Sequence, residues 1–195
     1  MADTKTRIVT KTGELFRRNG YVGTGLKQIA AEADAPFGSI YHFFPGGKQQ
    51  LAAEVIRAAG RMYQARVAEV LNQGTDPAHA MQVAFADAAQ LLIETDFADA
   101  CPIATIALEV ASTNEPLRQV TAEVFTEWID AGIGLFVHWG YPRPVARELS
   151  IAFLNALEGA FVLARALRST EPLEVAGATM SAAVSAAARA PGREG

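Results

Sequence analysis

A short run of residues near position 40 combines side chains of the kinds that contact nucleic acid. Gly38 leaves room for a close approach of the backbone, and Ser39 and His42 can bond to base edges or phosphates. Tyr41 presents a ring and a hydroxyl that can bond to a phosphate. Lys48 opens the following helical segment, where the helix dipole and free N–H groups also favour an anion. Two other interpretations stay open: Tyr41 as a core aromatic residue and His42 as a cation at a helix end.

Three further residues belong to the same candidate set. Thr24 precedes a short helical segment and can offer its hydroxyl to a phosphate, and Lys27 adds positive charge nearby. Phe37 either contacts a thymine methyl group or packs against its neighbours, and we favour packing.

The elements that must position these residues are three short helices. We expect the first from Asp3-Thr4 to Asn19-Gly20, the second over about 26–33 and the third from Pro36 to about Phe43. Two short helices around a tight break, braced by a first helix, form a helix-turn-helix. Ile40 and Phe44 have the character of anchors into its small core.

The charge of the chain is distributed unevenly. Residues 1–66 hold ten Lys and Arg against five Asp and Glu, a balance of +5, although the whole chain carries −4. The remaining residues carry −9. A cationic first third on an anionic remainder suggests that the first third binds a polyanion, although an ordinary solvated surface would show the same charges.

The order, spacing and types of these residues resemble the DNA-binding domain of the TetR family of bacterial regulators. The resemblance covers about residues 4–64 and rests on the segments Phe16–Tyr21, Thr24, Ile29-Ala30, Gly38–Phe44 and Lys48–Leu51. It implies that Thr24, Tyr41, His42 and Lys48 contact the DNA backbone and that residues 36–42 face the major groove. Pro45-Gly46-Gly47 and the segment 100–104 are similar to the subgroup tied to drug and flavonoid resistance.

Two positions depart from the family pattern. Gly25 stands where the family usually has a Ser or Thr N-cap, a change that costs only a few tenths of a kcal/mol. Phe37 stands where the family often has a polar residue that faces the groove.

Beyond residue 66 the chain again has the pattern of successive helices, with breaks before Pro77, Pro102, Pro116, Pro144 and Pro172. We therefore expect an all-α protein with an N-terminal three-helix helix-turn-helix domain at 1–66. The resemblance implies that residues 67–195 form a helical ligand-binding and dimerisation domain.

The resemblance also implies that the last two long helices carry the dimer interface. Their apolar and small residues could instead be buried within one protomer. The residues that we assign to the dimer interface are Leu149, Phe153, Leu157, Ala160, Phe161, Ala164, Ala182 and Ala186.

The resemblance implies an effector cavity in the same domain, and its apolar and aromatic residues are the candidates, although such residues are more often plain core. Asn155 and Glu158 are the polar candidates, because a polar pair one turn apart in an apolar helix needs partners. The apolar candidates for the ligand site are Met81, Phe85, Phe97, Cys101, Phe125, Trp128 and Phe136.

Several classes of protein are excluded. The apolar fraction of 50% argues against a disordered chain, and a single cysteine argues against a disulfide-stabilised fold. Three scattered histidines provide no metal site, and no nucleotide-binding loop, nucleophile elbow or catalytic carboxylate pair is recognisable, so we expect no enzyme and no cofactor. No stretch of about 18 uncharged apolar residues is present and the first residues are polar, which predicts a cytoplasmic protein without a membrane span.

The function expected from these features is a repressor that binds a palindromic operator as a homodimer. A small, apolar or aromatic effector would release it from the DNA. The alternative is a helical module that binds an apolar ligand or a partner protein and no DNA. A gel-shift experiment with the DNA upstream of its own gene separates the two.

Overall fold

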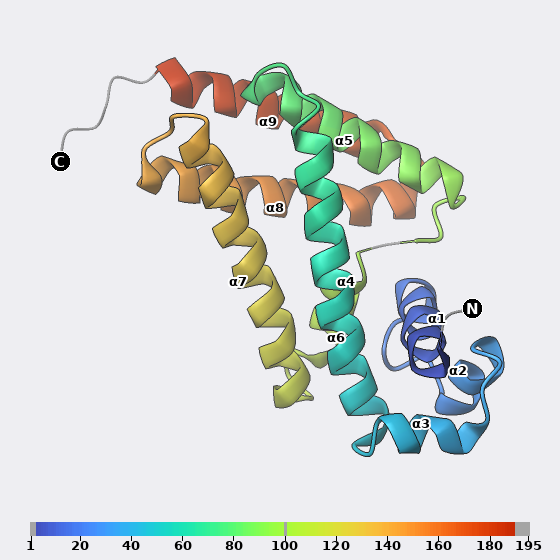
Figure 1. Ribbon diagram of the computed structural model, residues 1–195. Coiled ribbons are helices and arrows are strands. Elements are labelled where there is room, and N and C mark those ends of the chain that lie inside the picture. The colour runs from blue at the N-terminus through green and yellow to red at the C-terminus, as the bar shows by residue number, and fades with distance from the viewer. Residues whose placement is uncertain (1–2, 100, 190–195) are drawn as a thin grey trace. The chain divides into compact units, whose positions relative to one another are not determined.

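The computed structural model describes residues 3–99 and 101–189. Within these residues the chain forms nine α-helices and no strand, which confirms the predicted all-α class (Figure 1). The helices are α1 (Thr4–Asn19), α2 (Leu26–Glu32), α3 (Phe37–Phe43), α4 (Gly47–Leu71), α5 (Pro77–Glu94), α6 (Pro102–Val110), α7 (Glu115–His138), α8 (Arg143–Leu167) and α9 (Glu171–Arg189).

The helix starts follow from local chemistry that the sequence already displays. Asp3 caps α1, because its Oδ1 accepts a hydrogen bond from the Thr6 amide at 2.7 Å. This bond holds the pKa of the Asp3 carboxyl below its usual value. Asp76 caps α5 in the same way through the His79 amide at 2.9 Å, and Pro77 occupies the first turn, as predicted.

The chain divides into two compact units. The first contains residues up to 62 together with 100–124, and the second contains 63–99 and 125–195. The division expected at residue 66 follows the chain order, whereas the observed contacts group α6 and the beginning of α7 with the N-terminal helices.

The first unit buries a small apolar core under three short helices. Ile8 and Phe16 of α1, Ile29 of α2, Ile40 of α3 and Phe44 after it have no exposed surface. Arg7 of α1 also reaches the end of α2, where its Nε and Nη2 donate to the carbonyl oxygens of Ala33 and Asp34, both at 3.1 Å. These contacts hold the turn between α2 and α3 against α1.

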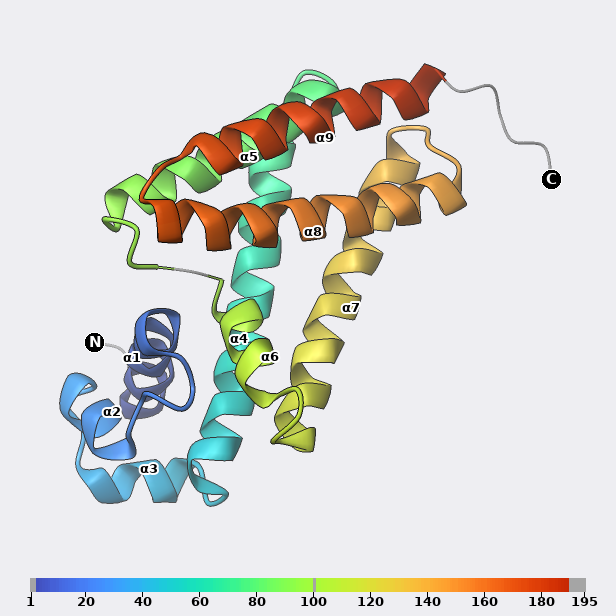
Figure 2. The same cartoon turned by 180° about the vertical axis from the view of Figure 1, so that it is seen from behind.

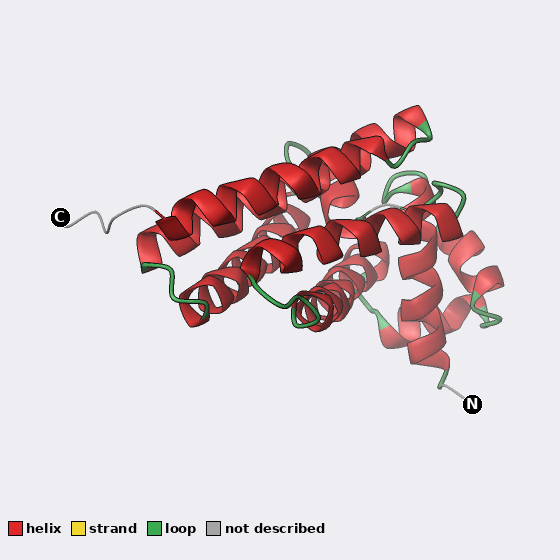
Figure 3. Ribbon diagram, turned by 90° about the horizontal axis from the view of Figure 1, so that it is seen from above, coloured by secondary structure: helices red, strands yellow, loops and turns green. Residues whose placement is uncertain are grey.

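In the second unit, α9 packs along both α5 and α8 (Figure 2), and Figure 3 shows the helices from above. The rings of Phe85 on α5 and Phe153 on α8 meet edge to face at 5.5 Å. Tyr141 donates its hydroxyl to the carbonyl oxygen of Val184 on α9 at 3.0 Å, and burial raises the pKa of this tyrosine. The core is therefore continuous across all three helices.

Gly177 sets the close approach of α9 to α5. A Cβ at Gly177 would lie 2.9 Å from the Cβ of Phe85, an atom fixed to the backbone of α5 that cannot swing aside. We expect Gly177→Ala to lower the free energy of unfolding by about 1 kcal/mol, because overpacking outweighs the gain in helix propensity. Urea unfolding at fixed protein concentration measures this change.

Gly134 on α7 provides the matched control. It is exposed, and a Cβ there would meet nothing within 4 Å. Gly134→Ala should therefore raise the free energy of unfolding by about 0.5–1 kcal/mol through helix propensity alone. Equal effects of the two substitutions would show that α5 and α9 do not meet closely at Gly177.

Candidate nucleic-acid interface

The helix-turn-helix consists of α2, a short turn and α3. Asp34 in the turn adopts a left-handed conformation with φ of 45°, and the Ala35 amide donates to the Ala30 carbonyl at 3.0 Å. Together with the two bonds from Arg7, these contacts fix the direction in which α3 leaves the turn.

One side of α3 is anchored and the other is open. Ile40 is fully buried, whereas Phe37 and Tyr41 are 44% and 49% exposed. Their rings contact each other edge to face at 5.8 Å, so Phe37 packs against Tyr41 and still presents apolar surface. Gly38 and His42 are exposed as well, and Ser39 is half-buried. The structure thus brings five of the sequence-predicted residues together on one short helix, and Lys27 on α2 is also exposed.

Lys48 lies in the first turn of α4, directly after this surface. Its Nζ stands 4.3 Å from the centre of the Tyr21 ring, a cation–π contact. Burial lowers the pKa of Lys48, and the negative charge of Glu109 acts in the opposite direction. Burial also raises the pKa of Tyr21. The ring of Tyr21 therefore holds the lysine in place. Tyr21 belongs to the segment Phe16–Tyr21, but the sequence alone does not reveal this role.

Thr24 lies in a different environment from the exposed one that a phosphate contact needs. Its side chain has no exposed surface, and its hydroxyl donates to the carbonyl oxygen of Gly20 at 2.8 Å. The predicted contact with a phosphate is not supported by this geometry, because the hydroxyl satisfies the end of α1 within the protein.

Glu109 on α6 is a residue that the sequence analysis missed. Its Oε2 accepts hydrogen bonds from the backbone amides of Tyr21 at 2.7 Å and Val22 at 2.9 Å. No local pattern could reveal this contact, because 88 residues separate Glu109 from Tyr21.

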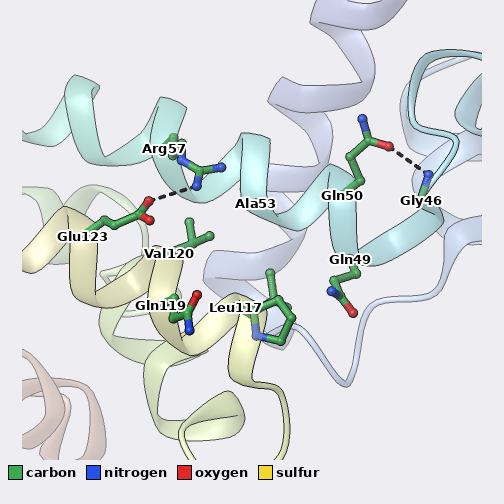
Figure 4. A pocket seen from close by; sticks show the side chains of 10 residues that line it. Gly46, Gln49, Gln50, Ala53, Arg57, Leu117, Gln119, Val120 and Glu123 are labelled. Atoms are coloured by element: carbon green, nitrogen blue, oxygen red, sulfur yellow. Dashed lines mark hydrogen bonds and ion pairs between the residues drawn. The ribbon is translucent and has the colours of Figure 1, made fainter.

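A shallow pocket of about 330 Å³ also lies in the first unit, between the first turns of α4 and α7 (Figure 4). Its polar groups largely bond to one another: Arg57 pairs with Glu123 at 2.9 Å, and Gln50 accepts from the Gly46 amide at 2.8 Å. None of the predicted ligand-site residues lines it. The lining residues are Gly46, Gln49, Gln50, Ala53, Arg57, Pro116, Leu117, Gln119, Val120 and Glu123.

The predicted ligand-site residues fall into three environments. Met81, Phe85 and Phe136 are buried in the core of the second unit. Phe97, Phe125 and Trp128 are half-buried in that unit, with the last two rings in edge contact at 5.8 Å. Cys101 instead lies in the first unit, where its Sγ caps α6 by accepting from the Ala104 amide at 3.5 Å.

The two polar candidates lie in different environments, and only Asn155 departs from the expected need for a partner. Asn155 is exposed, so water can satisfy its amide and the expected need for a protein partner does not arise. Glu158 is half-buried and does have an interaction partner.

The predicted interface residues divide between the inside and the outside of the second unit. Leu149, Ala160 and Ala164 are buried within the protomer, where they pack in its core. Phe153, Leu157 and Phe161 are half-buried, and Ala182 and Ala186 on α9 are exposed. Three large apolar residues of α8 that the sequence analysis did not select, Val162, Leu163 and Leu167, are exposed.

Comparison with known proteins assigns this architecture. Residues 8–55 match the family model for bacterial regulatory proteins of the tetR family, and residues 77–179 match the C-terminal domain of LmrA/YxaF-like transcriptional regulators. The HTH-type transcriptional regulator LmrA of Bacillus subtilis is 31% identical over 171 residues, which cover 88% of this chain and 91% of that protein. The HTH-type transcriptional repressor DhaR of a Mycobacterium species is 26% identical, with 89% of each chain covered.

A solved structure shows the same fold. The TetR transcriptional regulator from Legionella pneumophila superposes with a TM-score of 0.81 at 21% identity, covering 93% of this chain and 97% of that one. The family consists of transcriptional regulators and not of enzymes. Since the C-terminal model alone matches more than half of the residues, this chain belongs to the TetR family of bacterial transcriptional regulators.

Proposed function

We propose that the protein is a transcriptional repressor that binds a palindromic operator as a homodimer and is released by a small effector. The observation that carries the proposal is the exposed face of α3. Phe37, Gly38, Tyr41 and His42 are all exposed there, outside the protein core. A helix anchored on one side and open on the other can enter the major groove. The relative named as a repressor supports repression, and DNA binding in a bacterium implies a cytoplasmic protein.

The dimer is proposed on the apolar surface of α8. α8 is long and apolar enough, by length and composition, to cross a membrane. Only 22% of its most apolar stretch is buried within the protomer, so most of this stretch is left without cover. Val162, Leu163 and Leu167 are 61%, 55% and 65% exposed. Contiguous exposed apolar surface of this kind is typical of protein interfaces, and α9 with Ala182 and Ala186 lies beside it. Two copies would place their α3 helices on half-sites about 34–36 Å apart, or a multiple of that distance.

The effector is proposed to be apolar or aromatic and to bind in the second unit. Phe97, Phe125 and Trp128 are the predicted residues that keep partly exposed rings there. Such a ligand releases DNA only if it binds the non-operator conformation more tightly than the operator-bound one.

The phosphate contacts can be tested on the DNA upstream of the gene. Tyr41→Phe combined with Lys48→Ala should weaken binding to all sequences, by roughly tenfold to a hundredfold, and reduce the salt slope by about 1. Fluorescence anisotropy over a salt series measures both quantities.

Lys11→Ala is the matched control for these contacts, because Lys11 pairs with Glu14 on the surface of α1 and is not in the predicted contact set. The affinity of the Lys11→Ala variant for the upstream DNA should stay within about threefold of the wild type. A wild-type protein that ignores every promoter fragment at low salt would contradict the proposed function and favour the module that does not bind DNA.

Thr24 should behave differently from these contacts. Thr24→Val keeps the shape of the side chain and removes the hydroxyl bond to Gly20, so the free energy of unfolding should fall by about 1–2 kcal/mol. The folded variant should bind DNA more tightly than the Tyr41/Lys48 variant. Normal stability with a tenfold loss of affinity would instead restore Thr24 to the phosphate contacts.

The dimer interface can be tested by placing a charge on α8. Leu163→Glu should convert the protein to a monomer in sedimentation experiments and weaken operator binding, because a carboxylate would be desolvated between the two copies. Ile93→Glu on α5 is the control, since Ile93 is also 55% exposed and lies outside the proposed interface. A dimer that survives Leu163→Glu but not Ile93→Glu would place the interface elsewhere.

A further inference from the structure

We propose that Glu109 is a positioning residue for DNA binding: its carboxylate fixes the α1–α2 turn and, through Tyr21, the lysine that contacts the phosphate. The proposal rests on the proposed function, because it concerns the same surface. It assigns a role to a residue of α6 that lies outside the helix-turn-helix and touches no DNA.

The contact consists of two hydrogen bonds to one carboxylate oxygen. The backbone amides of Tyr21 and Val22 both donate to Oε2 of Glu109, at 2.7 Å and 2.9 Å. Hydrogen bonds to a charged acceptor are about twice as strong as neutral ones. Both amides belong to the turn that connects α1 to α2.

The turn is shaped to admit this carboxylate. Gly20, the residue after α1, has a φ of +72°, and a Cβ there would lie only 1.9 Å from Oε1 of Glu109. A glycine is therefore required at this position for two reasons: its backbone conformation and the space that the carboxylate fills. The Gly20 amide still closes α1 by donating to the Phe16 carbonyl at 3.0 Å.

The α1–α2 turn also positions Lys48. The same Tyr21 whose amide is held by Glu109 places its ring 4.3 Å from the Lys48 Nζ. The charge of Glu109 also acts directly on Lys48 by opposing the effect of burial on its pKa. If the carboxylate is removed, the backbone of Tyr21 loses its anchor and its ring no longer holds the lysine in one place.

Glu109 connects two parts of the sequence that the domain assignments separate. It lies within residues 77–179, which match the C-terminal family model, yet it belongs to the compact unit that contains α1, α2 and α3. On this proposal, the geometry of the DNA-binding surface depends on a residue that the family model places in the C-terminal domain.

Three substitutions at Glu109 separate contact from charge. Glu109→Gln keeps an oxygen acceptor at the same reach but loses the charge, so it should weaken binding by about threefold, less than the loss of the acceptor itself. Glu109→Asp keeps the charge but shortens the side chain by one methylene, and Glu109→Ala removes the acceptor. These last two should each weaken binding to the upstream DNA by roughly tenfold, as expected for the loss of a charged hydrogen bond.

Hydrogen exchange supplies a readout that does not depend on DNA. The amides of Tyr21 and Val22 should exchange faster in the Asp and Ala variants than in the wild type or the Gln variant. Glu123→Ala is the matched control, because it removes the same charge from an exposed ion pair with Arg57 in the same unit. It should change neither exchange at these two amides nor affinity.

The outcomes distinguish this proposal from the proposed function. A wild type that binds no promoter fragment would overturn the proposed function. A wild type that binds, with Asp and Ala variants as tight as Glu123→Ala, would overturn the role of Glu109 alone. A Gln variant as weak as Ala, or unchanged exchange at Tyr21 and Val22, would also overturn it. If Glu109→Ala fails to fold, the comparison of Glu109→Asp with Glu109→Gln still tests the role of Glu109.

Discussion

The orientation of α3 depends on the burial of Ile40 and Phe44, which both have no exposed surface. Side chains occupy fixed angular positions around a helix, so burying Ile40 necessarily turns Tyr41 and His42 away from that core. Two apolar side chains thus decide which groups of a seven-residue helix meet a ligand. The polar residues of α3 provide the groups that can bind a ligand, and the buried apolar residues determine the direction in which those groups face.

The helices of this surface are too short to be stable by themselves. Both α2 and α3 have seven residues and no side-chain cap at their N-termini, and isolated helices below about 12 residues are marginal in water. Long-range polar contacts take the place of local caps here. Arg7 satisfies carbonyl groups at the end of α2, and Glu109 satisfies amides before its beginning. Contacts from α1 and α6 therefore add to the contacts that the helix-turn-helix makes within itself.

This dependence explains which features the sequence predicts. Helix starts at Pro77 and Pro102 and the buried anchors Ile40 and Phe44 depend on local periodicity and caps, so they were predicted from the sequence alone. The environment of Thr24 was not predicted, because a hydroxyl before a helix is compatible with a phosphate contact and with a buried bond to a carbonyl. Only the folded backbone distinguishes the two. Glu109 gave no signal at all, because its partners lie 87 and 88 residues away.

The same reasoning applies to α8, where periodicity identifies an apolar helix but not which of its faces is covered. Small Ala160 and Ala164 turn inward, where α9 approaches closely, while the larger Val162, Leu163 and Leu167 remain exposed. Leaving such residues in water forgoes roughly 25 cal/mol for each Å² of apolar surface, and the proposed dimer would recover this free energy by covering them. A single α3 contacts only a few base pairs, so the same proposed association would also supply a second half-site. The proposed dimer would therefore answer two requirements at once: cover for the apolar residues of α8 and a second recognition helix for the operator.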